Sequence, residues 1–279
     1  FRGKPVAFGE TVRTAPDPDA LYDFTSHTFS TCGANGRYGP SLSACRNAYA
    51  TDWDEDPAHY DMSTQGIQEW VVPETGAYRI TAAGAQGGDS GGRGARVAAT
   101  VSLTAGDRLL LAIGQQGARN SRGGGYGGGG GGSYVALGTS HTSANPLLVA
   151  AGGNGRNSGS MGPGGSASQG SNGRGLTSGN GKGACGGGFY TSGACGNSSQ
   201  QDGRGFRQGA VGGGDHGSNP ADGGFGGGSG TYWNGSGAGG GYDGGSGMDS
   251  PSSAPSGVAA RSFIAPAATS PARATATNS

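Results

Sequence analysis

Short stretches that alternate apolar and polar residues recur between residues 20 and 153. Alternation with a period of two buries one face of a β-strand, and the glycine, proline and aspartate between the stretches are typical of turns. No stretch has the 3.6-residue period of an amphipathic helix. We therefore expect an all-β fold without a helix, a jelly-roll-like antiparallel β-sandwich. The expected strands are residues 21–29, 66–73, 77–85, 95–103, 108–113, 133–137 and 147–150.

Glycine dominates the chain from about residue 84 to residue 247 and makes up 66 of the 279 residues, against a usual share of about 7%. Aromatic residues interrupt the glycine runs, whereas disordered linkers are poor in them. The runs lack the Gly-X-Y period of collagen. We expect polyglycine II helices, which are extended, have three residues per turn and hydrogen-bond to their neighbours. They would form a bundle inserted into the sandwich, with the aromatic residues as anchors.

Composition divides the chain into four parts. Residues 1–19 are an extended arm, residues 20–153 the sandwich with glycine-rich insertions, and residues 154–247 the polyglycine-helix region. Residues 248–279 form a Ser/Pro/Ala/Thr-rich tail, typical of a linker or an O-glycosylated stalk. Ser262-Phe263-Ile264 interrupts this tail as a candidate short strand.

The arm allows two interpretations. It contains three prolines and no amphipathic helical pattern, so it is either a loose terminus or an extended strand that pairs with a neighbouring subunit. In the second case Val6, Phe8 and Val12 are the assembly residues. Copies joined head to tail in this way would form an open filament.

Charge and hydropathy exclude two classes of partner. The formal net charge is zero, from 18 basic and 18 acidic residues, so the basic surface of a nucleic-acid-binding protein is not expected. No apolar run approaches the roughly 20 residues that span a bilayer. Because the chain begins with Phe1 rather than Met, we expect a processed or fragmentary sequence.

Four cysteines, Cys32, Cys45, Cys185 and Cys195, allow three pairings, of which the local one is the simplest. A zinc site would need closer Cys-x-x-Cys pairs or histidine partners, and the four histidines are scattered. The cysteines therefore predict two disulfides, an oxidising extracellular compartment, and no metal or other cofactor.

No motif indicates catalysis. Residues 88–92 read Gly-Asp-Ser-Gly-Gly, the letters around the nucleophile of chymotrypsin-like proteases, but too little chain precedes Ser90 and no suitable histidine base is present. Residues 51–61 are acidic and could begin a calcium loop, but Pro57 stands where an EF-hand needs glycine. We expect a solvated loop there, and no enzyme.

Two kinds of residue are candidates for contact or modification. Tyr232, Trp233 and Tyr242 would either stack on glycans or anchor the bundle. Asn197 and Asn234 each begin an Asn-x-Ser triplet and are N-glycosylation acceptors if the source glycosylates.

Several ordered blocks carry a family resemblance. They are residues 29–36 with Gly39-Pro40 and Cys45, then residues 66–78, 114–117, 128–135 and 146–153. Together they resemble the extracellular glycine-rich domain of the anaplastic lymphoma kinase and leukocyte tyrosine kinase receptors, which is also found in bacterial and phage surface proteins. The resemblance covers roughly residues 23–243. It implies a sandwich similar to the tumour-necrosis-factor jelly roll, an inserted polyglycine bundle and a Cys32–Cys45 disulfide.

Two functions from different classes follow. The first is a secreted, non-enzymatic structural module that self-associates in an extracellular filament, appendage or matrix. The alternative is a ligand- or glycan-binding ectodomain or adhesin of a receptor or phage fibre. It would contact glycans or surface proteins at a cell or virion surface. The receptor's signalling role does not carry over, because this sequence contains no kinase domain and no transmembrane segment.

Overall fold

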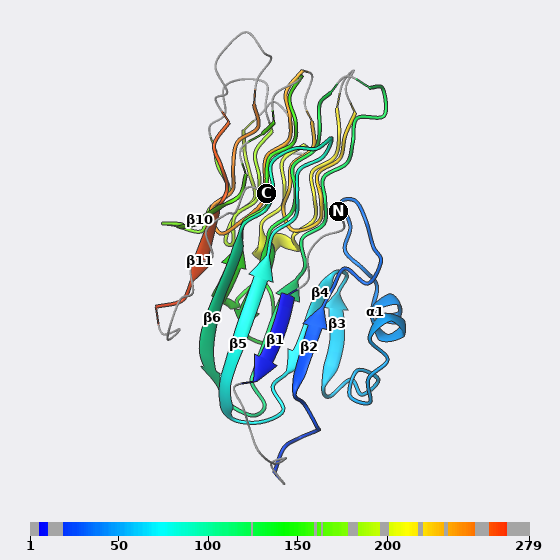
Figure 1. Cartoon of the computed structure of the whole chain (residues 1–279), viewed down its shortest axis with the longest axis vertical. Helices are drawn as coiled ribbons and strands as arrows, with labels where there is room; N and C mark the ends of the chain where they lie inside the picture. Colours follow the sequence, from blue (N-terminus) through cyan, green and yellow to red (C-terminus); the bar gives the residue numbers. More distant parts are fainter. Residues whose placement is uncertain are drawn as a thin grey trace.

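The computed structural model describes residues 6–10, 19–123, 125–158, 161–162, 164–177, 184–195, 201–216, 220–231, 234–248 and 257–266. Two β-sheets face each other, and glycine-rich connections rise from one end of them as extended, roughly parallel segments (Figure 1). The expectation of an all-β sandwich is confirmed.

The smaller sheet has four strands in the order β2-β1-β5-β6, and all its pairs are antiparallel. Its strands are β1 (Val6–Glu10), β2 (Ser26–Phe29), β5 (Gly76–Ala83) and β6 (Arg96–Leu103).

The larger sheet has seven strands in the order β10-β11-β9-β8-β7-β4-β3, antiparallel except for the pair β10 and β11. The seven strands are β3 (Tyr60–Thr64), β4 (Ile67–Val71), β7 (Arg108–Ala112), β8 (Ser133–Leu137), β9 (Asn145–Ala150), β10 (Ser166–Gln169) and β11 (Arg261–Ile264). The candidate strand in the tail is confirmed as β11, which pairs with β9, whereas β3 and β10 were not expected.

The larger sheet is buried on both faces at its centre, and this explains its continuous apolar runs. On β7, Leu109 and Leu111 point to the core shared with the smaller sheet. Leu110 and Ala112 point to a second core on the opposite face. Glycine-rich connections supply aromatic side chains to that second core, namely Phe189, Phe206, Phe225 and Tyr242.

Two short helices among the described residues, α1 and a 3-10 helix at Phe206–Gln208, correct the prediction that the fold has none. Helix α1 spans Leu42–Tyr49, and the Ser41 side chain caps it by accepting a hydrogen bond from the Ala44 N–H at 3.2 Å. Its two turns are shorter than the window over which helical periodicity can be recognised. The Cys32–Cys45 disulfide ties the helix to the preceding loop.

The N-terminal segment is also corrected. The arm, expected to be either a loose terminus or a strand that pairs with another subunit, contains β1, which lies between β2 and β5 of its own chain and pairs with both. Val6 is fully buried in the core. The sequence allowed a strand here but could not identify its partner. Phe8 belongs to β1, although its side chain lies outside the described structure, as does all of Val12.

Hydrogen bonds around residues 127–132 repeat every three residues. Successive N–H groups bond in rotation to three neighbouring segments, residues 153–156, 115–118 and 226–229. The pairs, each with the N–H donor named first and the carbonyl acceptor second, are Gly127 and Arg156, Gly128 and Ala118, Gly129 and Ser229, Gly130 and Gly153, Gly131 and Gln115, and Gly132 and Gly226, at 2.8–3.0 Å.

The carbonyl groups of the same segment bond to other neighbours. The O atoms of Gly127 and Gly130 accept from Gly237 and Gly240. Those of Gly128 and Gly131 accept from Gly88 and Ala85, and that of Gly129 accepts from Gly224. The segment is thus surrounded by six others. A Cβ on Gly129 would overlap the Ala238 carbonyl, so close approach of these backbones requires glycine.

Candidate functional site

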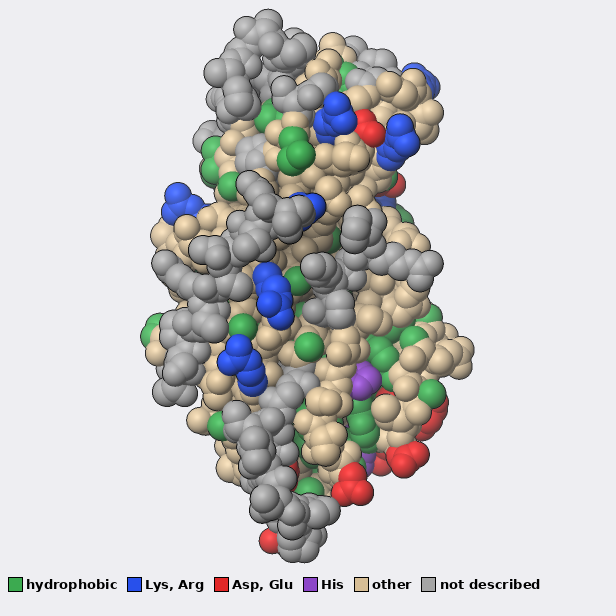
Figure 2. Space-filling model, viewed as in Figure 1, with side chains coloured by type: hydrophobic (Ala, Val, Ile, Leu, Met, Phe, Trp, Pro, Cys, Tyr) green, Lys and Arg blue, Asp and Glu red, His purple; other side chains and the backbone are tan. Residues whose placement is uncertain are grey.

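An acidic connection joins α1 to β3. Of residues 51–59, hereafter the acidic loop, Asp52, Asp54, Glu55 and Asp56 are acidic. The Glu55 and Asp56 side chains are 68% and 51% exposed. Figure 2 shows acidic side chains gathered at the end of the molecule where this loop lies, whereas Lys and Arg side chains lie elsewhere on the same face. The neutral total therefore conceals a segregated charge distribution.

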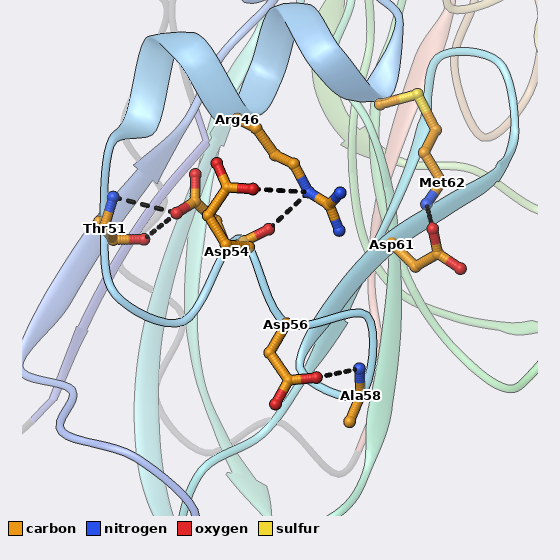
Figure 3. A network of polar contacts seen from close by, with 8 residues as sticks. Arg46, Thr51, Asp54, Asp56, Ala58, Asp61 and Met62 are labelled. Carbon is orange, nitrogen blue, oxygen red and sulfur yellow. Dashed lines mark hydrogen bonds and ion pairs between the residues drawn. The ribbon is translucent and has the colours of Figure 1, made fainter.

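Asp54 anchors the acidic loop through contacts with Thr51 and with Arg46 of α1 (Figure 3). It is fully buried, and its Oδ1 accepts hydrogen bonds from the N–H and the hydroxyl of Thr51, both at 3.0 Å. Arg46 of α1 donates its Nε–H to the Asp54 carbonyl oxygen at 2.8 Å and lies 3.8 Å from Glu55 Oε2. The loop is therefore fastened to the helix, while Asp52 and Glu55 remain exposed.

The far end of the loop is held by its own turns. Asp56 Oδ1 accepts from the Ala58 N–H at 2.8 Å; beyond the loop, in β3, Asp61 Oδ1 accepts from the Met62 N–H at 2.8 Å (Figure 3). His59 Nδ1 lies 3.7 Å from Asp56 Oδ2. Within the described residues, no three His, Cys, Asp or Glu side chains converge as metal ligands would.

Aromatic rings form the floor beneath the acidic loop. The His27 ring makes edge-to-face contacts with Phe29, Tyr49 and Trp53, at centroid distances of 4.6, 4.5 and 4.9 Å. Burial lowers the pKa of His27 to about 4, and the Asp54 carboxylate offsets only part of this shift. His27 is therefore neutral near pH 7 and packs as an aromatic ring.

A buried amide joins this floor to the larger sheet. The Tyr49 and Tyr60 hydroxyls donate to Gln68 Oε1 at 2.6 and 2.9 Å, and Gln68 Nε2 donates to the Ser30 carbonyl at 2.9 Å. Burial raises the pKa of Tyr49 to about 12 and raises that of Tyr60 as well, so both phenols stay protonated donors. The network fixes α1 and the acidic loop on β3 and β4.

The structure shows the partners of the cysteines and of the protease-like motif. The structure contains the disulfides Cys32–Cys45 and Cys185–Cys195. Buried Asp202 holds the second one, because its carboxylate accepts the backbone N–H groups of Cys185 and Cys195 at 2.7 and 3.2 Å. In the protease-like motif, Asp89 forms an ion pair with Arg119 at 3.1 Å.

Of the remaining predicted site residues, only Tyr242 and Asn234 lie in the described part of the chain. Tyr242 is buried and stacks on Phe263 of β11 at a ring-centroid distance of 4.3 Å, and its role as an anchor or a glycan contact stays a prediction. Tyr232, Trp233 and Asn197 lie outside the described residues, so their predicted roles stay predictions. Asn234 is exposed in a turn, and its glycosylation also stays a prediction.

Sequence reasoning treated the acidic loop as uniformly solvated and missed the inward anchors Asp54 and Arg46. A signal was present, because Trp53 interrupts the acidic run between Asp52 and Asp54. A large aromatic ring at that position indicates that the loop turns toward the core there. Trp53 is indeed buried.

The fold and the two disulfides define a disulfide-bonded β-sandwich module of the extracellular kind. The leukocyte tyrosine kinase receptor of Mus musculus is 36% identical over 102 residues, which is 34% of this chain and 12% of the receptor. No protein-family model matches the chain. The similarity and the disulfides together point to an extracellular module. In the described part of the chain, no helix has the length and apolar character needed to cross a bilayer.

Proposed function

We propose that this chain is a ligand-binding ectodomain module that presents its acidic loop to a positively charged partner. Three facts support the proposal: the similarity to a receptor, the exposed carboxylates of the loop, and the anchoring of the loop on α1. The observation that carries it is the combination of exposed Asp52, Glu55 and Asp56 with the buried anchor Asp54.

A rigid loop suits recognition. Asp54 and Arg46 fix the loop before a ligand arrives, so little conformational entropy is lost on binding. Exposed carboxylates of one sign steer a cationic partner and increase its association rate, an effect that salt screens over about 8–10 Å.

The glycine-rich connections would serve as the scaffold. We propose that they are a bundle of polyglycine II helices. The three-residue repeat of hydrogen bonds around residues 127–132 and their six neighbouring segments support this. A helix with three residues per turn directs successive N–H groups in three directions. Such a bundle would stiffen the module without requiring large side chains.

The test is a binding titration of the whole chain with a fluorescent lysine-rich peptide at several salt concentrations. The double variant Asp52→Asn/Glu55→Gln removes two exposed loop charges and leaves the buried anchor intact. The matched control Asp107→Asn/Asp215→Asn removes two charges elsewhere. We expect the loop variant to bind about tenfold more weakly and the control to match the wild type. Equal binding by the loop variant and the wild type would falsify the proposal.

Filament formation through the N-terminal arm is not part of this proposal, because β1 is paired on both sides within its own chain. Electron microscopy and light scattering of the undenatured protein check this point. We expect dispersed particles. Regular filaments that disappear when residues 1–10 are deleted would restore the structural-subunit hypothesis.

A further inference from the structure

The outer face of the smaller sheet carries arginine. On β5, Tyr78 and Ile80 point into the core, and Arg79 between them is exposed on the other face. On β6, Arg96 is exposed in the same way. The register pairs Arg79 with Thr100 and Arg96 with Ala83, which places both arginines on the outer face. Figure 2 views this side of the molecule and shows basic side chains on it.

Small side chains lie between the two arginines. Arg79 and the partner of Arg96 are four residues apart on β5, or about 13 Å at 3.3 Å per residue. The outward positions between them are occupied by Thr81, Ala98 and Thr100. Thr81 and Thr100 are half-buried and Ala98 is buried, so no large side chain of β5 or β6 stands between the two arginines.

No acidic side chain among the described residues neutralises the charges on this face. Arg79, Arg96 and Arg93, which is exposed three residues before Arg96, form no ion pair with any described residue. The outward positions of β5 and β6 contain no carboxylate. The planar guanidinium fork binds sulfate and phosphate oxygens in pairs, which a lysine cannot do.

We propose that the arginine face, defined by Arg79 and Arg96, binds a linear sulfated polysaccharide of the extracellular surroundings. The polysaccharide's sulfate groups would bind the two separated guanidinium groups, with the chain lying over the small side chains between them. This site is separate from the acidic loop. The loop's carboxylates would repel the same ligand and so orient it on the module. The two proposals use different residues and fail independently.

Other polyanions fit the arginine face less well. The outward positions of β5 and β6 carry no aromatic ring on which nucleic-acid bases would stack. They also carry no large apolar side chain that would insert into a membrane surface. An extracellular module meets sulfated glycans rather than intracellular nucleic acid.

The experiment measures the affinity of the whole chain for a heparin oligosaccharide of defined length. The variant Arg79→Gln/Arg96→Gln removes two charges from the arginine face. The matched control Arg174→Gln/Arg204→Gln removes two exposed arginines from the glycine-rich connections. We expect a loss of about tenfold or more for the face variant and less than about twofold for the control. Binding should weaken as salt rises, and the desulfated oligosaccharide should not bind.

Four results would overturn the proposal. They are no binding by the wild type, equal losses in both double variants, undiminished binding of the desulfated oligosaccharide, and tighter binding of anionic lipid vesicles or single-stranded DNA. Thermal unfolding of each variant confirms that it is folded. All four substituted arginines are exposed, so we expect unchanged midpoints.

Discussion

The sandwich and the glycine-rich connections are both buried, but different interactions stabilise them. In the sandwich, large side chains such as Trp70, Tyr78 and Leu111 fill the space between two sheets. Around residues 127–132, backbone N–H and C=O groups bond to six neighbouring segments, and a Cβ has no room. The first region depends mainly on burial of apolar surface, and the second on satisfied backbone hydrogen bonds.

This difference predicts opposite responses to mutation. A side-chain core tolerates changes that conserve volume, because rotamers and neighbours adjust. A backbone core has no rotamers, and an added methyl group must push whole segments apart. Tolerance to substitution therefore distinguishes the two regions more sharply than burial does.

The largest effect is expected for Gly129→Ala. The new Cβ would overlap the Ala238 carbonyl and separate segments that hydrogen-bond to one another. We expect a loss of more than about 4 kcal/mol in the free energy of unfolding, measured by denaturant titration. As a control, Gly106→Ala adds the same methyl group where no atom lies within 4 Å and should cost about 1–2 kcal/mol, because φ is +87° there. Similar losses for the two variants would contradict a backbone-packed core.

The second effect is expected in the sandwich. Leu111 is fully buried in the core, and Leu111→Ala should cost about 3 kcal/mol through lost burial and a residual cavity. Leu111→Ile keeps the volume and should cost less than about 1.5 kcal/mol. The same denaturant titration measures both. If the isoleucine variant were as damaging as the alanine variant, the sandwich would be no more tolerant than the glycine-rich region.

The two regions also differ in how far the sequence predicted them. The strand Arg108–Ala112 was predicted because its short, continuous apolar run is typical of a strand that is buried on both faces. Helix Leu42–Tyr49 was too short to show its period, and polar Tyr60–Thr64 was too weakly patterned to be recognised as a strand. Glycine runs predict close backbone packing, but glycine carries no side chain that specifies which segments become neighbours. The partners of residues 127–132 therefore emerged only from the structure.

The acidic loop was only partly predictable for a related reason. Its charges are visible in the sequence, whereas the Arg46 bond to the Asp54 carbonyl depends on a helix that was not expected. Likewise, a strand around Val6 was one of two interpretations of the arm, and such a strand could pair either within its own chain or with another subunit. Local alternation contains no information about that choice.

Tyr134 tests the junction between the two regions. It lies on β8, and its buried hydroxyl lies 3.2 Å from the Gly226 carbonyl and 3.1 Å from the Gly241 carbonyl. Tyr134→Phe keeps the ring and removes this donor, so we expect a loss of about 1 kcal/mol. Thermal unfolding of the variant should remain a single transition. Two separate transitions would mean that the hydroxyl is what makes the regions unfold together.

Lowering the pH tests the contribution of His27, which lies in the sandwich. The pKa of His27 is about 4 in the folded chain and 6.5 as the reference value, so the unfolded state binds more protons between these values. Stability should therefore fall as the pH drops from 6.5 to 4 and should be independent of His27 above that window. The ring is only partly buried, so we expect less than about 1 kcal/mol. The pH dependence of the unfolding midpoint should be flatter in His27→Gln; an identical dependence in the two proteins would remove His27 as its cause.

The smallest effect on stability is expected for the loss of an exposed charge, which can be compared with the addition of a methyl group nearby. Arg119 pairs with Asp89 at 3.1 Å, but its side chain is 81% exposed, so Arg119→Ala should cost less than about 0.5 kcal/mol. Gly88 precedes Asp89, and a Cβ on it would overlap the Ala118 carbonyl. Gly88→Ala should therefore be several times more damaging than the loss of a whole charged side chain, as measured by denaturant titration of both variants. The reverse order would mean that ion pairs, rather than contact between backbones, stabilise the glycine-rich region.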